Sequence, residues 1–435
     1  MSSNSDARKI RVAIIGAGIG GLSCAVALKH CTNVDVDLYE QAAQITEIGA
    51  GVAVWPRTWE ILKSMGLEDD LSCLLKEPPS NTQKVAFEMR LSDRKEGFTF
   101  RKIFTRDGGF NFHRSDLQGA LLRHVPSSCR IHLSHRFERC EEADDAVTLF
   151  FDNGLVVSYD LVIGADGIKS ALRQYVSNSG ELLYTGSRAF RGLVSRERLM
   201  NLFPNHRALV NATMYNGKSK HIVVYPINGG KLINIVAFVS NPDEDGKVIP
   251  GLEVRQATKK EVVEAFSEWE PEAVEILSTI DNPSCWPIRD LRPLNTYTSR
   301  RILLLGDAAH AMSPHLGAGA GQAIEDGYVL GRLFEKLMES SSTNDSEGLL
   351  HLIKVYDNIR RPFANYLQKM SRKQGYYNEL NMPEFKDVHQ EGQELDAYQI
   401  VALGSALKEN WSWWEECADY EMEQALQILK AQGKL

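Results

Sequence analysis

The residues with the clearest chemical purpose are three glycines near the start of the chain. Gly16, Gly18 and Gly21 have G-x-G-x-x-G spacing and directly follow the apolar run at residues 12–15, which predicts a buried strand. In such a unit the first glycine permits a tight turn, the second lets a pyrophosphate approach the backbone, and the third lets a helix pack on the strand. Residues 22–30 are the predicted helix, whose first N–H groups would meet the phosphates. The spacing therefore predicts a dinucleotide site.

Further residues around this unit suit the same ligand. Glu40 ends a second apolar run, residues 34–39, where a carboxylate accepts hydrogen bonds from a ribose. The mostly small residues 42–56 come next, and we expect them to run along the ligand. Arg114 precedes another predicted helix and could contact phosphate or sugar oxygens, although a surface arginine is the alternative. A purely structural glycine turn remains an alternative for the whole unit, but the strand–helix–strand frame favours binding.

Two later strand–glycine segments also carry acids. Asp166 stands between glycines after a short apolar run, where an acid either caps the next helix or orders a ligand. Asp307 follows a third apolar run and a glycine, and a loop containing Pro314 leads to a predicted helix at residues 322–338. This third segment again directs N–H groups at a ligand.

Two histidines in the third segment could suggest a metal site. His310 and His315 lie in the same loop. However, the sequence has no H-E-x-x-H motif, and we expect no carboxylate to join these two histidines at helical ligand spacing. We therefore predict no metal.

Residues 187–240 change character and predict an antiparallel sheet. Asn228-Gly229-Gly230 predicts a hairpin turn between the last two strands. Arg191 lies in the first strand and Tyr225 in the third, where His221, Val223 and Tyr225 share a face at period two. These polar residues either face water at an edge or form part of a site. The predicted strands are residues 189–194, 208–215, 221–227 and 231–239.

Composition limits the class of protein. The length of 435 residues favours two closely joined domains. A net charge of −8 without a long basic run excludes a nucleic-acid binder. Seven scattered cysteines and a start without an apolar signal segment predict a cytoplasmic protein with reduced thiols. Glycines interrupt the apolar stretch at residues 12–28, so we expect no stable membrane insertion.

The end of the chain predicts helices at residues 348–366 and 407–431. The second contains Trp411, Trp413 and Trp414, which could form a membrane-interface belt or belong to a packed helical region. Acidic residues crowd the same stretch and favour the packed helical region.

The three glycine motifs, in this order, resemble those of the group A FAD-dependent aromatic monooxygenases, most closely the salicylate hydroxylases and related fungal phenol hydroxylases. The resemblance spans roughly residues 10–375. It implies an α/β fold with a Rossmann-like FAD-binding domain of the aromatic hydroxylase type, an antiparallel β-sheet substrate domain and a C-terminal helical region. The expected boundaries are residues 1–75, 106–180 and 290–375 for the FAD-binding domain, 76–105 and 181–289 for the substrate domain, and 376–435 for the helical region.

The resemblance also implies which residues hold a noncovalent FAD. In the family, the acid after the second strand binds the adenosine ribose, the arginine of an H-R-x-D-L segment contacts FAD, and the acid of the third motif holds the ribityl chain. The acid of the D-G motif is linked to the use of FAD and NAD(P)H. The matching residues here are Glu40, Arg114, Asp307 and Asp166, with backbone near Ala53 and Ala320 lying on the cofactor.

The implied reaction uses NADH or NADPH as a transient co-substrate. Reduced flavin reacts with O2 to give a C4a-hydroperoxide with an electrophilic distal oxygen, so the substrate is a small electron-rich aromatic, most simply a phenolate. In the fungal phenol hydroxylases an arginine and a tyrosine matching Arg191 and Tyr225 are catalytic. Arg191 would stabilise the phenolate or a carboxylate, and Tyr225 would hydrogen-bond the phenolic oxygen. His221 and Pro314 are further candidates for the substrate pocket.

Several functional alternatives stay open at this point. Attack at a carbon bearing a carboxylate would release CO2, as in the conversion of salicylate to catechol. The substrate could instead be a larger phenolic fungal metabolite. Another FAD or NAD oxidoreductase, such as a dehydrogenase or amine oxidase, would be reduced by its substrate without NAD(P)H. A regulatory protein would bind the nucleotide without turnover. The sequence leaves the choice of NADH or NADPH and the oligomeric state undecided.

Overall fold

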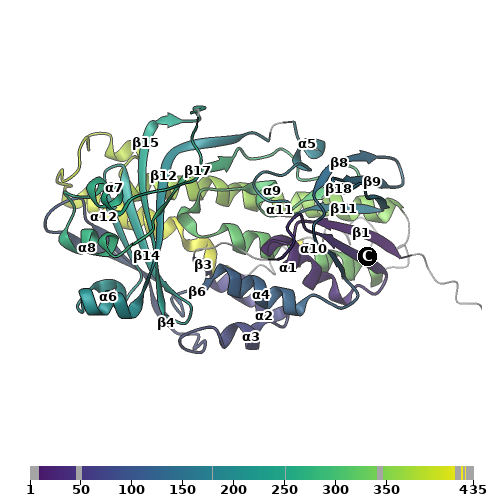
Figure 1. Ribbon diagram of the computed structural model, residues 1–435, viewed down its shortest axis with the longest axis horizontal. Helices are drawn as coiled ribbons and strands as arrows, with labels where there is room; N and C mark the ends of the chain where they lie inside the picture. Colours follow the sequence, from purple (N-terminus) through teal and green to yellow (C-terminus); the bar gives the residue numbers. More distant parts are fainter. Residues whose placement is uncertain are drawn as a thin grey trace, which may run out of the picture.

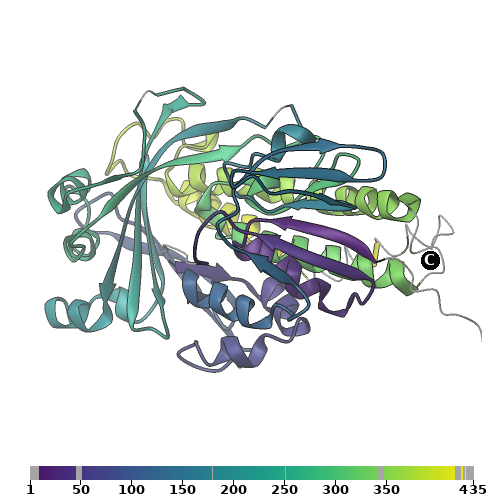
Figure 2. The ribbon, with the colours of Figure 1, turned by 45° about the vertical axis from the view of Figure 1, so that its right-hand side comes forward.

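The computed structural model describes residues 9–45, 51–178, 180–249, 251–339 and 346–416, together with residues 423, 424 and 427. Two β-sheets dominate the molecule and lie along its long axis (Figure 1), the eight-stranded sheet on the left and the five-stranded sheet on the right. Figure 2 shows the same arrangement turned, with helices packed beside both sheets. The α/β fold is confirmed, whereas the exact domain boundaries stay predictions.

The five-stranded sheet carries the three predicted ligand motifs. Its order is β18-β11-β1-β2-β7, and every neighbouring pair is parallel. The motifs follow β1, β11 and β18, which are neighbours, so their loops meet at the carboxyl edge where open α/β sheets bind ligands. The strands are β1 (Ile10–Ile15), β2 (Val34–Tyr39), β7 (Arg130–His132), β11 (Leu161–Gly164) and β18 (Ile302–Leu304).

Two helices that follow glycine loops pack unusually closely beside this sheet. A Cβ added at Gly327 would lie 2.7 Å from the backbone nitrogen of Cys24, and one at Gly331 would lie 2.7 Å from the carbonyl oxygen of Ala27. Glycine at these two positions therefore lets α10 approach α1. The main helices of this half are α1 (Ile19–Ala27), α2 (Pro56–Ser64), α4 (Arg114–His124), α10 (Gly319–Glu339) and α11 (Ser346–Asn378).

Smaller elements complete this half of the molecule. Three antiparallel strands form a separate sheet, and a two-stranded ribbon joins the segment after β2 to the segment before α4. These strands are β8 (Phe137–Glu142), β9 (Val147–Phe151), β10 (Val156–Tyr159), β3 (Gly51–Val54) and β6 (Phe110–His113). The short helices are η1 (Leu28–His30), α3 (Glu68–Ser72), α5 (Arg173–Val176), α9 (Asp307–His310) and η3 (Pro314–Leu316).

The antiparallel pairing predicted for residues 187–240 is confirmed, because β12, β15, β14 and β13 pair antiparallel in that order. The whole sheet has the order β16-β17-β12-β15-β14-β13-β4-β5 and is mixed, since β13 pairs with β4 in parallel. β4 and β13 come from distant segments without a hairpin to set their direction. The strands are β4 (Gln83–Leu91), β5 (Phe98–Arg106), β12 (Leu182–Ser195), β13 (Thr213–Gly217), β14 (Lys220–Ile227), β15 (Leu232–Asp245), β16 (Arg255–Gln256) and β17 (Ser284–Leu291).

The predicted turn between the third and fourth strands of that region is confirmed. Asn228, Gly229 and Gly230 all have positive φ, and the turn joins β14 to β15. One face of the sheet packs Ile222, Ile235 and other apolar side chains against α6 (Arg196–Leu202), α7 (Lys259–Ala265) and α8 (Pro271–Ser278). The other face turns toward the five-stranded sheet.

The C-terminal region is helical, but its bounds differ from those predicted. α11 continues through Pro362 to Asn378, because its apolar face packs along the length of the molecule. The later helix is α12 (Ala397–Asn410), which a capping box at Asp396 starts, followed by η5 (Ser412–Glu415); η2 (Arg207–Leu209) and η4 (Pro383–Phe385) are short turns elsewhere. Most of the predicted stretch 407–431 beyond Glu416 lies outside the described residues. Among the described residues, no helix has the length and apolar character needed to cross a bilayer.

A buried charge network ties three helices together. The carboxylate of Glu325 on α10 accepts two hydrogen bonds of 2.8 Å from Arg57 on α2 and another from Arg360 on α11. Arg360 also donates to Asp326 at 2.8 Å. These four side chains are at most 1% exposed. Burial alone would raise the pKa of Glu325, but Arg360 and Arg57 outweigh it and hold that pKa below its ordinary value.

Arg360→Met should destabilise the protein strongly. It removes the cation shared by Glu325 and Asp326, so that only Arg57 and His310 remain beside the two buried carboxylates, a loss of about 3–5 kcal/mol. The neighbouring Arg361 is partly exposed and pairs with Asp357 four residues before it, so Arg361→Met is the matched control and should cost clearly less, about 1 kcal/mol. Urea denaturation followed by circular dichroism measures both. Equal stabilities of the two variants would contradict a supporting role for the network.

Candidate functional site

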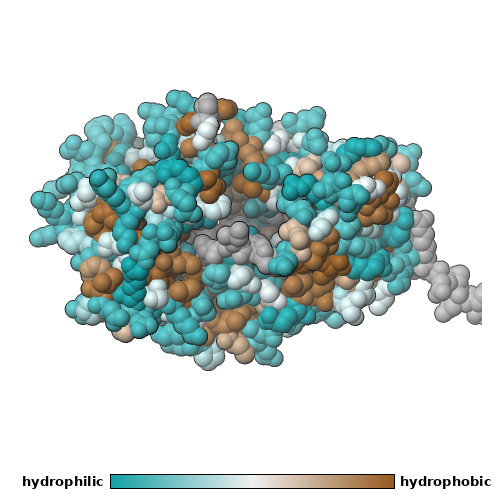
Figure 3. All heavy atoms as spheres, in the orientation of Figure 1, coloured by the Kyte–Doolittle hydropathy of each residue, from teal (hydrophilic) through white to brown (hydrophobic). Residues whose placement is uncertain are grey.

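A single cavity connects the two sheets. It has a volume of ≈ 360 Å³ and extends from the three motif loops to the inner face of the eight-stranded sheet. The face shown in Figure 3 is hollowed at its centre, between the two halves of the molecule. The loops form one side of this cavity and the sheet forms the other. A ligand bound by the loops would therefore meet a ligand bound by the sheet.

The glycine loop leaves open space at its middle position. A Cβ at Gly16, whose φ is +108°, would lie 2.3 Å from the carbonyl oxygen of Ala165, and one at Gly21 would lie 1.9 Å from the carbonyl oxygen of Gly16. These two glycines are required by the protein itself. A Cβ at Gly18, which lines the cavity at the N-terminus of α1, would come within 4 Å of no atom of the described residues. The space beside Gly18 is therefore available to a ligand.

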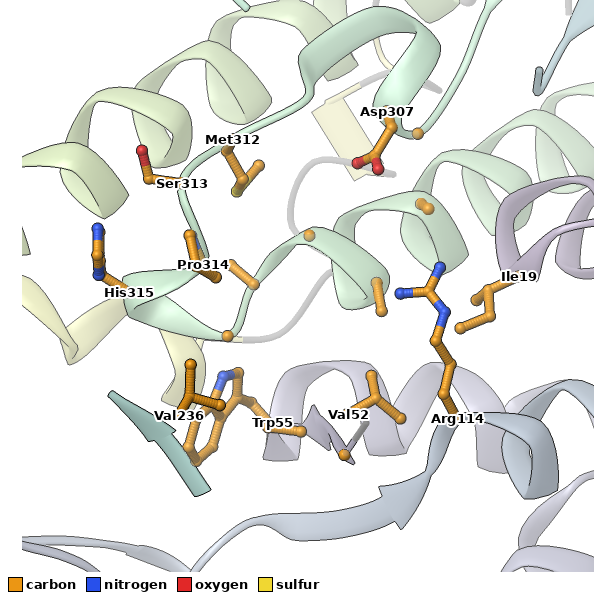
Figure 4. A pocket seen from close by; sticks show the side chains of 18 of the residues that line it. Ile19, Val52, Trp55, Arg114, Val236, Asp307, Met312, Ser313, Pro314 and His315 are labelled. Atoms are coloured by element: carbon orange, nitrogen blue, oxygen red, sulfur yellow. The ribbon is translucent and has the colours of Figure 1, made fainter. Parts of the chain in front are cut away.

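Charged side chains line the cavity near this loop. Arg114 starts α4 and Asp307 starts α9, and Figure 4 shows both side chains pointing into the same space. Ala53 on β3 and Ala320 on α10 also line the cavity. The predicted cofactor residues Gly18, Ala53, Arg114, Asp307 and Ala320 thus come together from five separate segments.

Two predicted acids are turned toward backbone instead. Glu40 accepts hydrogen bonds of 2.8 Å from the N–H of Ala17 and 2.9 Å from that of Ala42, so it holds the glycine loop in shape. Asp166 accepts from the N–H groups of Ala171 and Leu172 at 2.8 and 3.1 Å, which closes the turn before α5. Neither acid lines the cavity in this structure. Their predicted contacts with FAD stay predictions.

Arg191 and Tyr225 lie on the cavity side of the second sheet. Arg191 on β12 is opposite Val236 on β15, which is opposite Val223 on β14, two residues before Tyr225. All four side chains therefore share one face, and all four residues line the cavity. Within the described part of the chain, neither the Arg191 guanidinium nor the Tyr225 hydroxyl makes a hydrogen bond or ion pair. Arg191 lies over the Trp286 ring, 5.2 Å from its centroid.

Burial changes the acid–base properties of this pair. Burial lowers the pKa of Arg191. Tyr225 acts to raise that pKa, and the positive charge of Arg114 acts to lower it further. Burial raises the pKa of Tyr225 to about 12, against the attraction of Arg191 for a phenolate. At neutral pH the pair therefore consists of a cation and a neutral hydroxyl donor. Such a pair suits an anionic or phenolic oxygen.

Comparison with known proteins decides the family. A family model described as an FAD binding domain matches residues 9–371, most of the chain. The chain belongs to this family of FAD-binding monooxygenases. A salicylate hydroxylase of Pseudomonas putida is 33% identical over 428 residues, covering 96% of this chain and 94% of that protein. A 6-methylsalicylate 1-monooxygenase of Aspergillus terreus is 30% identical over 367 residues, covering 81% of this chain and 79% of that one.

A solved structure supports the same membership. A salicylate hydroxylase in a substrate complex matches with a TM-score of 0.83 and 30% identity, covering 96% of this chain and 98% of that chain. The protein is therefore an FAD-dependent enzyme of the aromatic monooxygenase family, and the resemblance inferred from the three motifs is confirmed.

The cavity fits the family's cofactor. Open space at Gly18 beside the N-terminus of α1 suits a pyrophosphate. The Asp307 carboxylate and the Arg114 guanidinium line the space beyond it, where they can meet sugar hydroxyls and phosphate oxygens. Bound there, FAD would lie between the parallel sheet and the face that carries Arg191.

Arg173 is a positioning residue that the sequence analysis missed. It is 5% exposed and donates to the carbonyl oxygens of Ala308, Ile168 and Asp307 at 2.8, 2.9 and 3.0 Å. It therefore joins the loop of the D-G motif to the loop that carries Asp307. An arginine at the start of a short helix reads as a surface residue, and its partners are backbone atoms, so residue types alone did not indicate this role.

Pro314 and His221, the two remaining candidates for the substrate pocket, differ in their position relative to the cavity. Pro314 lines the cavity, whereas His221 lies behind the lining. The His221 ring stacks on Phe238 at 4.3 Å and lies 5.1 Å from the ring of His315, which does line the cavity. Burial lowers the pKa of His221 to about 3, so it is neutral. His315 stood out in the sequence only as a possible metal ligand; among the described residues, no group of three or more His, Cys, Asp or Glu could hold a metal.

A buried carboxyl group supports these histidines. Glu379, just after α11, is 3% exposed, lies 2.9 Å from the Nδ1 of His221 and accepts a 2.8 Å hydrogen bond from Ser240. Burial raises the pKa of Glu379 to about 7, although His315 and the hydrogen-bond donors favour its ionised form. Glu379 therefore changes charge near neutral pH, next to the cavity wall.

Gly18→Val should weaken FAD binding without unfolding the protein. Gly18 has φ −70° and ψ −178°, which valine adopts readily, and the added side chain enters space meant for the pyrophosphate. Loss of charge-assisted hydrogen bonds worth about 1.5–3 kcal/mol should weaken FAD binding roughly 10- to 100-fold. Fluorescence titration of the apoprotein with FAD measures this.

Two other glycines complete that test. Gly119→Val, on α4 away from the cavity, should bind FAD normally. Gly16→Ala should prevent folding because its Cβ meets backbone. Wild-type FAD affinity in Gly18→Val would place the pyrophosphate elsewhere.

Glu379→Gln should make stability less dependent on pH. The folded pKa of about 7 lies above the ordinary 4.5, so the native state holds more protons between these values. Stability from this group is then present below pH 4.5 and declines as pH rises through 7. The stability difference, variant minus wild type, should increase across that window in urea titrations. The exposed Glu384→Gln should show a flat difference, and a flat difference for Glu379→Gln would contradict the raised pKa.

Proposed function

We propose that this protein is an NAD(P)H-dependent monooxygenase that hydroxylates a phenolic or hydroxybenzoate-type aromatic. The observation that carries the proposal is Arg191, a cavity-lining guanidinium without an ion-pair partner among the described residues, on the same sheet face as Tyr225. Arg191 is partly buried at the cavity wall, and a ligand anion would pair the charge of a cation that has no partner there. Phenolates and carboxylates both provide such an anion.

The walls of the cavity suit an aromatic ring. Trp55, Phe87, Met214 and Phe238 supply apolar lining elsewhere in the same cavity. Aromatic and thioether side chains favour flat ligands and exclude water, which strengthens the interaction with Arg191. The relatives named for salicylate and 6-methylsalicylate act on aromatic acids of this kind, which supports the same class here.

The residues of the chain have distinct tasks in the proposed reaction. Arg191 attracts the anion and favours loss of the phenol proton. Tyr225 stays protonated, since its pKa is about 12, and donates a hydrogen bond to the phenolate oxygen. Together they orient an electron-rich ring. When bound, reduced flavin would activate O2, so that one oxygen atom enters the ring and the other leaves as water, with NAD(P)H supplying two electrons.

Decarboxylation depends on the substrate carbon that is attacked. If that carbon bears a carboxylate, CO2 leaves in place of a proton and salicylate gives catechol. A larger phenolic metabolite is the alternative substrate. A panel of phenols, hydroxybenzoates and polycyclic phenols, assayed for stimulated NAD(P)H oxidation and product mass under 18O2, tests these options. Flavin reduction by the aromatic itself, or the absence of stimulated oxidation, would overturn the proposal.

Arg191→Ala and Tyr225→Phe should retain FAD but lose hydroxylation. Loss of one preorganised donor costs about 10²–10³-fold in rate. In Arg191→Ala the remaining activity should rise with pH, because the variant depends on phenol that is already ionised in solution. Product formed per NAD(P)H consumed, measured across pH, is the readout.

The matched control lies on the same strand. Arg188, three residues before Arg191, points to the other face of β12, and it does not line the cavity. Arg188→Ala should keep near-normal coupled turnover. Near-normal turnover in both Arg191→Ala and Tyr225→Phe would show that the substrate anion is held elsewhere.

A further inference from the structure

The C-terminal segment supplies a wall of the cavity. In Figure 1 the yellow end of the chain runs from α12 toward the centre of the molecule. Trp411, which directly follows α12, lines the cavity and is 2% exposed. Its ring lies 5.3 Å from that of Phe87 and 5.3 Å from that of Trp55, both nearly perpendicular. These three rings form a continuous aromatic surface, called here the tryptophan wall.

Several contacts hold Trp411 in place. Asn410 donates to the side-chain oxygen of Gln374 at 2.8 Å and so fixes the end of α12 on α11. Thr105 on β5 donates to Glu415 at 2.6 Å on the far side of the tryptophan. The segment that carries Trp411 is therefore anchored on both sides. A side chain held this way resists displacement by a ligand.

The Trp55 ring links the wall to the third motif. Its Nε1 donates to the carbonyl oxygen of Leu316 at 3.0 Å, next to Pro314 and His315. Figure 4 shows Trp55 below Pro314, facing the same cavity. The tryptophan wall thus stands beside the loop that leads into α10.

The wall lies at the opposite end of the sheet face from Arg191. Paired residues form a row across five strands, from Arg191 through Val236, Val223 and Met214 to Met89 on β4. Neighbouring strands are about 4.8 Å apart, so the row spans about 19 Å. Phe87 stands two residues before Met89 on β4. One end of the cavity floor is therefore cationic and the other aromatic.

We propose that Trp411 is a specificity-determining residue that limits the length of apolar substituents on the substrate. The inference rests on the proposed function, since it takes the substrate's anionic oxygen to lie at Arg191 and Tyr225. A substituent that points away from that oxygen extends toward the tryptophan wall. The substrate class is then a phenol or hydroxybenzoate with an apolar chain that extends along the sheet face, and chains that reach beyond the tryptophan wall collide with the Trp411 indole.

The test compares ligand-length preference in variants of two neighbouring tryptophans. Trp411→Leu and the milder Trp411→Phe shorten the wall. Trp413→Leu is the matched control, because Trp413 is also buried, at 4% exposed, in the same segment but does not line the cavity. FAD occupancy of each purified variant checks folding. The ligands are 4-alkylphenols of increasing chain length.

Binding is measured without NAD(P)H, from the change in flavin absorbance, and turnover is measured separately. Trp411→Leu should raise the ratio of long-chain to short-chain affinity at least about 10-fold, since one methylene in an apolar pocket changes selectivity by 10-fold or more. Trp411→Phe should give a smaller change in the same direction, and Trp413→Leu none. An unchanged ratio in Trp411→Leu, or an equal change in Trp413→Leu, overturns the inference.

The two readouts separate this inference from the proposed function. A shifted binding ratio without hydroxylated product would support the role of Trp411 and overturn the proposed reaction. Hydroxylated product with an unchanged binding ratio would support the proposed reaction and overturn the role of Trp411. Binding of none of the alkylphenols by wild type or variants would overturn both.

Discussion

The structure depends on a group of buried charges that balance one another. Glu325 and Asp326 on α10 face Arg57 from α2 and Arg360 from α11, and all are essentially inaccessible to water. Asp326 also accepts a 2.8 Å hydrogen bond from the N–H of Gly306, the glycine directly before Asp307. Buried carboxylates keep their charge only while their partners stay in place. The network therefore fixes where the third motif lies relative to the helices around the cavity.

The parallel sheet explains why three distant motifs act together. Strands β1, β11 and β18 are neighbours, so loops that are far apart in sequence share one edge. Arg173 then clamps the second loop to the third through backbone carbonyls. The cofactor side of the cavity is thus a rigid construction of backbone and buried charge. Such rigidity keeps N–H groups and carboxylates aimed at a ligand before it binds.

The side of the cavity opposite the motif loops has charged and apolar side chains at different ends and carries no sequence motif. Arg191 has its charge unpaired within the described residues and faces the cavity with Tyr225, while Phe87, Trp55 and Trp411 close the far end with aromatic rings. Glu379 and His221 lie behind this wall and bring a titrating carboxyl close to it. The cavity therefore has a cationic end and an aromatic end.

The sequence by itself determined the local units of this protein. Gly16, Gly18 and Gly21 indicate a phosphate loop because each is needed for the backbone conformation or packing of residues close to it in sequence. Period-two spacing placed His221, Val223 and Tyr225 on one face of a strand. The order of the motifs was enough to identify the family. Tertiary structure alone decided the parallel pairing of β4 with β13, the clamp formed by Arg173, the burial of Glu379 and the place of Trp411 in the cavity. Each of these depends on contacts between residues far apart in the chain, and neither residue type nor local spacing carries information about such a partner.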